Sequence, residues 1–438
     1  MPAGLLIIGA SEIATLAGGP RHGSAQADAG VLRDAAGGLA VAVVDGSIRS
    51  VGPDAEVRRS LQGAGVDLAE LEIINARGGL VTPGLIDAHT HLVFSGTRER
   101  ELRLRQAGAT YLEILGAGGG ILSTVERTRE ASEEELRTHG RRWLDEMLRH
   151  GVTTIEAKSG YGLDVETELR LLAVAAELSR EGPVELVPAW LGAHAVPREL
   201  RQLPNAADAY LANVVEEQLP RVAEQGVARF CDVFCEFGVF DAAQSRRVLE
   251  AGARLGLRPR LHADEIRDSG GAALAAELHA ASADHLAAVS DAGIEALGRA
   301  ADEGHPVVAT LLPATTLYLM SEHYAPARRL IERGVPVALG TDFNPGTSPT
   351  PNLQLVLSIA CLKLKLTPQE ALVAATANAA LSLGLEKTHG TIEPGRVADL
   401  VVWNVPSVDL LPYWVGADLA RIVVKRGRVV LDRDAVGS

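Results

Sequence analysis

The sequence predicts an α/β fold, a (β/α)8 TIM barrel with a small composite β-sandwich domain from the N- and C-terminal segments. Two observations carry this prediction. In the middle of the chain, short apolar runs rich in Val, Ile, Leu and Thr alternate with longer segments rich in Ala, Leu, Glu and Arg, as in repeated βα units. On both sides of this region, short β-like runs are broken by Gly, Pro and Asp. We therefore expect the sandwich at residues 1–80 and 388–438 and the barrel at residues 81–387.

Eight apolar runs are the expected barrel strands, and eight parallel strands favour a closed barrel. They lie at residues 85–92, 153–158, 185–191, 229–235, 258–261, 281–285, 306–311 and 336–340. Residues 133–149, 165–180 and 241–255 have helical periodicity. In the N-terminal segment we expect strands at residues 41–44 and 47–51. In the C-terminal segment we expect strands at residues 390–402 and 420–430, which rejoin the N-terminal sheet.

The composition is that of a cytoplasmic protein. Of 438 residues, 47% are hydrophobic and 22% are charged, and no run of eighteen apolar residues could span a bilayer. The start of the chain lacks the basic segment of a secretion signal, and three cysteines form no spaced framework, which fits a reducing compartment. The net charge of −14 disfavours nucleic acids and anionic membranes as partners. An anionic substrate would therefore need a local cation.

The expected barrel strands end in polar residues. In a (β/α)8 barrel, the C-terminal ends of the strands form the active site. One histidine at a strand end is more often structural than functional, but five histidines and an aspartate on one face together predict a functional site. The polar residues at the strand ends are His89, His91, Lys158, His194, Glu236, His262, His285 and Asp342.

Four of these residues predict a site for one divalent metal ion. His89 and His91 are two positions apart, so on a strand their side chains point the same way. His262 from the fifth strand and Asp342 after the eighth could complete a shell of three histidines and one carboxylate. Such a shell leaves a position for water, as catalytic zinc requires.

Two further residues are candidates for proton transfer and for carbonyl polarisation. Glu265 follows His262 by three residues and could reach the water as a general base; alternatively it is a solvated loop acid. His285 could stabilise a developing oxyanion; alternatively it supports the metal ligands.

Several motifs resemble the amidohydrolase superfamily over nearly the whole chain. These are Val81-Thr-Pro-Gly-Leu-Ile-Asp-Ala-His-Thr-His91, Gly390-Thr-Ile-Glu-Pro-Gly-Arg-Val-Ala-Asp399, His262, His285 and Asp342. Within the superfamily, five stretches resemble the imidazolonepropionase family. They are His91-Leu-Val-Phe-Ser-Gly-Thr-Arg98, Gly108-Ala-Thr-Tyr-Leu-Glu113, Gly118-Gly-Gly-Ile121, Lys158-Ser-Gly-Tyr-Gly162 and Asp342-Phe-Asn-Pro-Gly346.

The resemblance implies a reaction and a set of catalytic residues. The reaction is hydrolysis of the cyclic amide of 4-imidazolone-5-propanoate to N-formimidoyl-L-glutamate. One zinc or iron ion would be held by His89, His91, His262 and Asp342. Glu265 and Asp342 would move protons, and His285 would hold the oxyanion. A homodimer is the assembly that the family suggests.

The resemblance also implies the residues around the substrate. Because the substrate carries a propanoate and the protein is acidic, a guanidinium that binds a carboxylate in two places is the expected anchor. Arg98 is the candidate for this anchor. The full set of expected substrate-binding residues is Arg98, Tyr111, Tyr161, His194, Glu265, Asn344, Gly346 and Thr347.

Two alternative functions and one uncertainty about the number of metal ions remain open. Another amidohydrolase, resembling a dihydropyrimidinase or a deaminase, would share the metal ligands, but a neutral base would not need Arg98. A non-catalytic metal-binding barrel is disfavoured because Glu265 and His285 are both present. Binuclear amidohydrolases bridge two metals with a carboxylated lysine, a role that Lys158 could take, whereas its Ser-Gly-Tyr context favours the mononuclear pattern.

Overall fold

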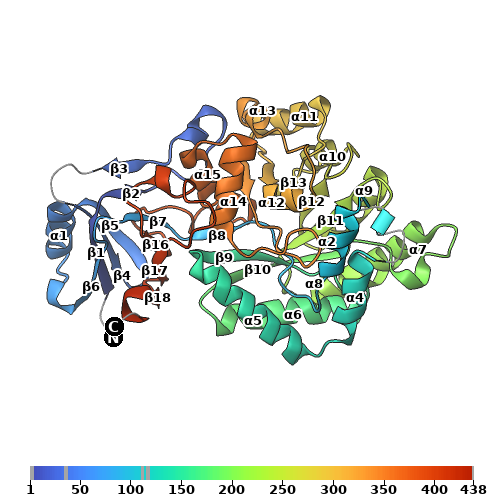
Figure 1. Cartoon of the computed structure of the whole chain (residues 1–438), viewed down its shortest axis with the longest axis horizontal. Coiled ribbons are helices and arrows are strands. Elements are labelled where there is room, and N and C mark those ends of the chain that lie inside the picture. Colours follow the sequence, from blue (N-terminus) through green and yellow to red (C-terminus); the bar gives the residue numbers. More distant parts are fainter. Residues whose placement is uncertain (1–3, 34–37, 110–112, 115–118, 437–438) are drawn as a thin grey trace.

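The computed structural model describes residues 4–33, 38–109, 113–114 and 119–436 (Figure 1). Tyr111, which was expected at the substrate site, lies outside these residues. Two bodies of structure are visible: a sheet-rich part that contains both ends of the chain and a larger part in which helices surround a parallel sheet.

The larger part is the predicted barrel. Its eight strands pair in the order β15-β14-β13-β12-β11-β10-β9-β8, and each neighbouring pair is parallel. The first and last strands are joined by a parallel bridge between Thr90 and Phe343 and by a 2.9 Å hydrogen bond from the Asp342 amide to the His89 carbonyl. The strands are β8 (Leu85–Asp87), β9 (Val152–Lys158), β10 (Glu185–Ala193), β11 (Phe230–Cys235), β12 (Arg258–Ala263), β13 (Ser282–His285), β14 (Val308–Leu311) and β15 (Val337–Leu339).

All eight predicted barrel strands and the three predicted helices are present, but the first strand ends at Asp87 and not at residue 92, so His89 and His91 follow the strand. Helices α5 (Glu133–Arg149) and α9 (Ala242–Arg254) begin at capping boxes, in which Ser132 with Glu135, and Asp241 with Gln244, satisfy the first backbone amides. The third, α6, is Val165–Glu181. The other helices are α1 (Asp54–Gly63), α2 (Glu99–Gln106), α4 (Ile121–Glu130), α7 (Ala206–Asn213), α8 (Leu219–Gln225), α10 (Gly271–Glu277), α11 (Asp291–Asp302), α12 (Pro313–Tyr318), α13 (Ala327–Glu332), α14 (Leu353–Ile359), α15 (Pro368–Ala374), α16 (Ala377–Ser382) and α17 (Arg433–Val436).

The smaller part is a β-sandwich of two sheets, ordered β5-β4-β1-β6 and β18-β17-β16-β7-β2-β3. Apolar side chains of both sheets form one core, which includes Leu5, Val41, Val81 and Val402. The strands are β1 (Gly4–Ala10), β2 (Glu12–Ala14), β3 (Val31–Arg33), β4 (Leu39–Val44), β5 (Ser47–Pro53), β6 (Leu71–Asn75), β7 (Leu80–Pro83), β16 (Leu400–Trp403), β17 (Ala420–Lys425) and β18 (Arg428–Asp432).

The C-terminal strands rejoin the N-terminal ones, as expected, but one predicted strand was too long. Of residues 390–402, only those from Leu400 onward are strand. Gly390 and Gly395 have φ angles of +83° and +85°, and Pro394 lies between them, so this stretch forms turns. The predicted strand at residues 420–430 is a hairpin, because Arg426 and Gly427 both have positive φ. The domain boundaries stay predictions.

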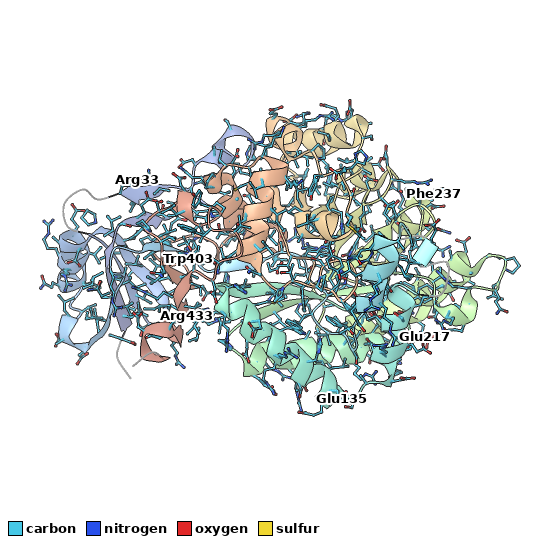
Figure 2. The ribbon with its side chains drawn as sticks, viewed as in Figure 1. Arg33, Glu135, Glu217, Phe237, Trp403 and Arg433 are labelled. Carbon is cyan, nitrogen blue, oxygen red and sulfur yellow. The ribbon has the colours of Figure 1, made fainter. Side chains whose placement is uncertain are left out.

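The sandwich contacts the barrel at the N-terminal ends of barrel strands. Trp403 is fully buried there, and its indole N–H donates a 2.8 Å hydrogen bond to the Thr82 hydroxyl (Figure 2). A Cβ on Gly151, the residue before β9, would lie 2.7 Å from the indole ring. Glu185, the first residue of β10, forms an ion pair with Lys425 at 3.3 Å. The C-terminal ends of the strands therefore stay open for a site. Within the described part of the chain, no helix is both long and apolar enough to cross a membrane.

Candidate active site

A cavity of about 380 Å³ lies at the C-terminal ends of the barrel strands. Ten of the predicted site residues line it, and Ile121 and Phe234 line it as well, although sequence reasoning did not single them out. His89 and Gly346 do not line it, but His89 lies beside Asp342 and Gly346 beside Arg98, which do. The predicted residues on the wall are His91, Arg98, Tyr161, His194, His262, Glu265, His285, Asp342, Asn344 and Thr347.

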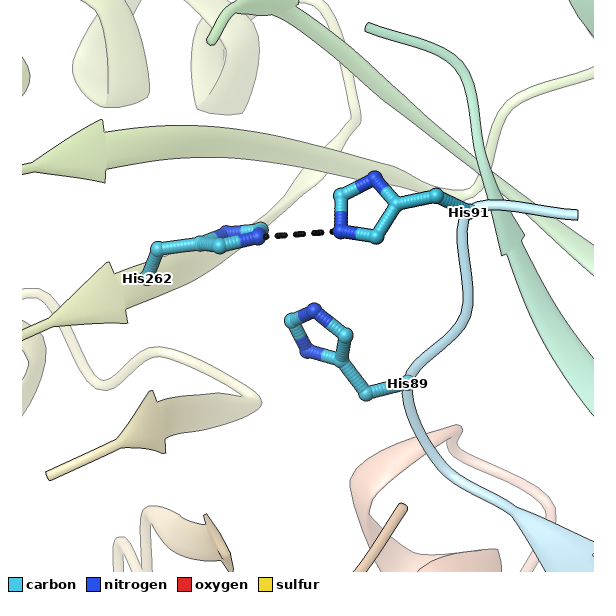
Figure 3. Close-up of side chains that lie close together, drawn as sticks. All are labelled: His89, His91 and His262. Atoms are coloured by element: carbon cyan, nitrogen blue, oxygen red, sulfur yellow. Dashed lines mark hydrogen bonds between the residues drawn. The ribbon is translucent and has the colours of Figure 1, made fainter. Parts of the chain in front are cut away.

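Four ring and carboxylate atoms face one another at the bottom of the cavity. The Nε2 atoms of His91 and His262 are 3.4 Å apart, and the Nε2 of His89 points into the same space (Figure 3). Asp342 Oδ1 is 3.5 Å from His89 Nε2 and 3.3 Å from His91 Nε2. His285 is close enough to His89 and Asp342 to form a second group of three possible ligands. We call His89, His91, His262, His285 and Asp342 the ligand cluster.

The ligand cluster fits a divalent metal ion. His89 Nε2 and His285 Nε2 are buried without a hydrogen-bond partner among the described residues, and buried polar atoms are rarely left so unless something else satisfies them. Two imidazole nitrogens face each other across 3.4 Å, which a cation between them would stabilise. Three histidines and one carboxylate are also a donor set that catalytic zinc uses. The predicted metal set thus lies together in space.

The pKa values within the ligand cluster agree with a cation site. Burial lowers the pKa of His262 to about 3 and that of His91 below its usual value, so both rings are neutral and offer lone pairs. Burial and Lys158 also lower the pKa of His89, but the nearby carboxylates of Asp284 and Asp342 outweigh them and raise it to about 9. The cluster therefore attracts one positive charge at neutral pH. A metal ion supplies that charge in place of a proton.

The backbone at two of these residues is held in an uncommon conformation. His285 has a φ of +74° and Asp342 a φ of +53°, in the left-handed region that side chains other than glycine seldom adopt. Such conformations cost free energy and cluster at functional sites, where the surrounding structure enforces them. The Thr315 hydroxyl fixes Asp342 further by donating a 2.7 Å hydrogen bond to Oδ2, which leaves Oδ1 facing the histidines.

Glu265 is a largely buried acid, and the loop that carries it is anchored by a second acid, Glu236. The Glu236 carboxylate accepts hydrogen bonds from the backbone amides of Ile266 at 2.8 Å and of Phe237 at 2.9 Å. Burial raises the pKa of Glu265 to about 8, with smaller contributions from Asp342 and Glu236. A carboxyl group with a pKa near neutrality can both accept and donate protons. Glu236, which sequence analysis placed at a strand end, therefore supports the loop instead of entering the cavity.

His285 lies beside Glu265, with its Nε2 3.8 Å from Glu265 Oε2. Burial lowers the pKa of His285 to about 4, so the ring is neutral in the protein. A neutral imidazole that donates a hydrogen bond can stabilise negative charge on a carbonyl oxygen. The geometry therefore permits the predicted role, and it equally permits a metal contact.

Arg98 lines the cavity from the opposite wall, immediately before helix α2. Its Nε and Nη2 bind Glu101 at 3.0 and 2.8 Å, and Glu101 also contacts Arg105 at 3.3 Å. A Cβ on Gly346 would lie 2.0 Å from Arg98 Nη1, so the guanidinium would have to shift for any larger residue at this position. The expected contact of Gly346 with a substrate stays a prediction.

Tyr161 and His194 are held by the loop after β9. The Glu168 carboxylate accepts three backbone hydrogen bonds of 2.7–2.9 Å from Gly160, Gly162 and Leu163. His194 Nδ1 is 3.0 Å from the Gly160 carbonyl, and its ring stacks on His91 at 5.1 Å. Burial, together with His91 and His262, lowers the pKa of His194 well below its usual value. This ring is therefore a neutral hydrogen-bonding group of the cavity wall.

Asn344 shapes the loop that carries Asp342. Its Oδ1 accepts hydrogen bonds from the backbone amides of Gly346 at 2.8 Å and Thr347 at 2.7 Å, and its Nδ2 donates to the Asp342 carbonyl at 2.7 Å. Both Asn344 and Thr347 line the cavity. Their contacts with a substrate stay a prediction.

Sequence reasoning missed a group of charged side chains beneath the ligand cluster. Glu156, Asp232, Arg260 and Asp284 are fully buried on the barrel strands, together with Lys158. A signal was available, because ionisable residues inside apolar strands are rarely buried unless they are paired. These five residues, which we call the ionic cluster, surround one another within 3.5 Å.

Comparisons with known proteins decide the family. A model described as "Amidohydrolase family" matches residues 111–431. An imidazolonepropionase from Geobacillus kaustophilus is 49% identical over 98% of each chain, and one from Symbiobacterium thermophilum is 48% identical over 99% of each chain. The chain belongs to the imidazolonepropionase family of amidohydrolases. As a member of the imidazolonepropionase family, the chain is a hydrolase that acts on carbon–nitrogen bonds, and its ligand cluster is a candidate site for a divalent metal ion.

Solved structures confirm the fold of this imidazolonepropionase family member. A 5-methylcytosine deaminase from Klebsiella pneumoniae is 17% identical, covers 98% of each chain and superposes with a TM-score of 0.72. A variant of an atrazine chlorohydrolase from Arthrobacter aurescens, complexed with zinc and atraton, is 19% identical over 98% of this chain and 96% of its own, with a TM-score of 0.70. At these identities the likeness establishes the fold alone.

Proposed function

We propose that the chain hydrolyses the ring amide of 4-imidazolone-5-propanoate to N-formimidoyl-L-glutamate. The curated relatives named imidazolonepropionase support this substrate. The structural observation that carries the proposal is that the ligand cluster and Arg98 line one cavity. A metal site beside a guanidinium fits a reacting amide that is covalently attached to a carboxylate.

The resident cation in this proposal is one zinc or iron ion, held by His89, His91, His262 and Asp342. These donors suit both metals. When bound, such an ion supplies Lewis acidity, which polarises a carbonyl and lowers the pKa of water toward 7.

Glu265, Asp342 and His285 act on the reacting amide. Glu265, with a pKa of about 8 and a buried position on the cavity wall, takes a proton from the attacking water and returns it to the ring nitrogen that leaves. Asp342 assists the proton transfer. His285, which is neutral, donates a hydrogen bond to the oxygen on which negative charge develops.

The other residues of the cavity wall bind and orient the substrate. Arg98 binds the propanoate, and Tyr161 and His194 contact the ring on the side of the β9 loop. Gly346 gives the guanidinium room, and Asn344 and Thr347 shape the wall next to Asp342. Tyr111, outside the described residues, completes the expected set.

We also propose that the protein works in the cytoplasm as a homodimer, without nucleic acid or membrane partners. The acidic net charge of −14 supports the absence of polyanionic partners. Light scattering coupled to size-exclusion chromatography tests the dimer, since a mass of one chain at micromolar concentration would contradict it.

An ultraviolet assay with freshly generated 4-imidazolone-5-propanoate tests the function. The metal-loaded protein should consume the imidazolone and produce formimidoylglutamate, and Arg98→Ala and Glu265→Gln should both be severely impaired. Arg103→Ala, an exposed arginine on the same helix as the Glu101 partner of Arg98, is the matched control and should behave like the unaltered protein. Absence of turnover by the unaltered, metal-loaded protein would overturn the proposal. Turnover of a neutral cyclic amidine, unaffected by Arg98→Ala, would favour the deaminase-like alternative.

A further inference from the structure

The ionic cluster is an unusual concentration of buried charge. Glu156, Lys158, Asp232, Arg260 and Asp284 have side chains that are 0% exposed, and they come from four strands of the barrel, β9, β11, β12 and β13. Lys158 Nζ contacts Asp232 at 2.5 Å, Glu156 at 2.7 Å and Asp284 at 3.5 Å. Buried ion pairs seldom stabilise a fold relative to apolar packing, so a cluster of this size calls for another reason.

Two carboxylates of the ionic cluster reach upward to two imidazoles of the ligand cluster. Asp284 Oδ2 is 2.7 Å from His89 Nδ1, and Asp232 Oδ2 is 3.1 Å from His262 Nδ1. A carboxylate accepts a hydrogen bond, so each ring carries its proton on Nδ1 and presents the Nε2 lone pair to the metal site. His91 differs, because its Nδ1 has no hydrogen-bond partner among the described residues.

The two cations of the ionic cluster hold these carboxylates in place. Arg260 contacts Asp284 at 3.2 Å and donates a 3.0 Å hydrogen bond to the carbonyl of Ala88, the residue before His89. Lys158 contacts both aspartates. Three carboxylates and two cations leave the cluster with a net charge of −1, which favours a cation in the adjacent site.

We propose that Asp284 and Asp232 are positioning residues that fix the proton and the orientation of His89 and His262, and that Lys158 serves this cluster instead of bridging a second metal ion. The inference rests on the metal site of the proposed function. It accounts for five buried charges that the reaction itself does not use. Three carboxylates surround the Lys158 amino group, which agrees with the single metal ion of the proposed function.

Metal affinity tests the proposal without reference to turnover. Zn²⁺ is titrated into the metal-free full chain in competition with a chromophoric chelator. Asp284→Asn and Asp232→Asn should each weaken zinc binding by roughly 10- to 100-fold, the usual effect of losing a carboxylate behind a metal-binding histidine. The unaltered protein should bind one zinc ion per chain, and two ions with similar affinity would overturn the assignment of Lys158.

Glu156→Gln is the matched control. Glu156 has the same charge and the same full burial, and it contacts Lys158 and Arg260, but the structure records no hydrogen bond or ion pair between it and a histidine. Its replacement should change zinc affinity less than about threefold, well below the loss expected for a carboxylate that contacts a ligand. An equal loss in Glu156→Gln would mean that the cluster acts only through its total charge, which would overturn the positioning role.

A second measurement needs no variant and guards against variants that do not fold. Two-dimensional NMR of the zinc-loaded protein labelled with ¹⁵N-histidine identifies which ring nitrogen carries the proton. We expect His89 and His262 protonated on Nδ1 with the metal on Nε2, and the reverse arrangement at either ring would overturn the proposal. If the protein binds zinc as described but does not open the imidazolone, the proposed substrate fails while this inference stands.

Discussion

The ligand cluster and the ionic cluster lie next to each other inside the barrel, yet their charges are compensated in different ways. In the ionic cluster, every charged side chain has an oppositely charged neighbour within 3.5 Å. In the ligand cluster, the Nε2 atoms of His89 and His285 have no hydrogen-bond partner among the described residues. Both clusters are buried, so burial alone does not explain the difference.

The difference indicates that the ionic cluster supports the site and that the ligand cluster binds the metal ion. In the ionic cluster, each charged side chain lies beside an opposite charge of the protein, and a net charge of −1 remains. The ligand cluster is complete only with a cation, since His91 Nε2 and His262 Nε2 face each other at 3.4 Å. The metal site is therefore recognised by imidazole nitrogens that face one another, and the supporting cluster by buried charges that are paired with opposite charges.

Removing the metal should have the largest effect. Dialysis against a chelator should lower turnover by about 10³-fold or more, because the ion contributes several kcal/mol to the transition state. His262→Ala should do the same and should also lose zinc binding. Restoration by Zn²⁺ or Fe²⁺ in the unaltered protein alone is the control, and full activity of the chelated protein would contradict the comparison.

Replacing Glu265 should come next. Glu265→Gln should lower kcat by about 10²- to 10⁴-fold, the contribution of a general acid–base group. A base works when deprotonated, so kcat/KM of the unaltered protein should fall as pH decreases through the pKa of Glu265. That pKa is about 8 without the ion, and a bound cation lowers it. A pH profile from 5 to 9 should show this limb, and the variant should lack it.

The same raised pKa predicts a gain in stability of the metal-free variant. The folded-state pKa of Glu265 exceeds its ordinary value of 4.5, so its contribution to stability is lost as pH rises from about 4.5 to 8. Metal-free Glu265→Gln should therefore melt at a higher temperature than the metal-free parent at pH 8. Equal melting temperatures at pH 8 would show that Glu265 is not buried as described.

Breaking the ionic cluster should cost stability. Lys158→Ala leaves three buried carboxylates without their shared cation and should lower the free energy of unfolding by about 3–5 kcal/mol. Urea denaturation of the metal-free protein measures this change. Arg329→Ala is the control, because the Arg329–Asp291 pair is on the surface and should contribute less than about 1 kcal/mol.

The smallest effect is expected at the substrate anchor. Arg98→Ala should raise KM by roughly 10- to 100-fold, since hydrogen bonds to charged groups contribute about 1.5–3 kcal/mol. The change also removes one partner of Glu101. The double variant Arg98→Ala/Glu101→Gln therefore separates the two effects, and it should keep the raised KM while regaining stability. An unchanged KM would exclude Arg98 as the anchor.

The fold and the metal ligands could be predicted because both leave local patterns. Apolar runs indicate strands directly. The spacing of two between His89 and His91 predicts that their side chains point the same way. The ionic cluster could not be assembled from sequence, because Asp232 meets His262 only through the pairing of β11 with β12. The sequence also could not show that Arg98 packs against Gly346, because the two residues are 248 positions apart in the chain. A strand was predicted across residues 390–399 because they include apolar side chains. These side chains pack on the core of the sandwich, but the backbone there forms no strand.

The pairing of the two chain ends in one sheet sets the order of events on the ribosome. Strand β7 lies between β2 and β16, and Thr82 is 321 positions from Trp403, to which it is hydrogen-bonded. At roughly 5–20 residues per second, the nascent chain waits on the order of 15–60 s between the two. The apolar face of β7 stays uncovered by β16 during that interval, while all eight barrel strands are translated. The barrel is thus made before the sandwich that caps it, and translation must reach β16 before that sheet can close.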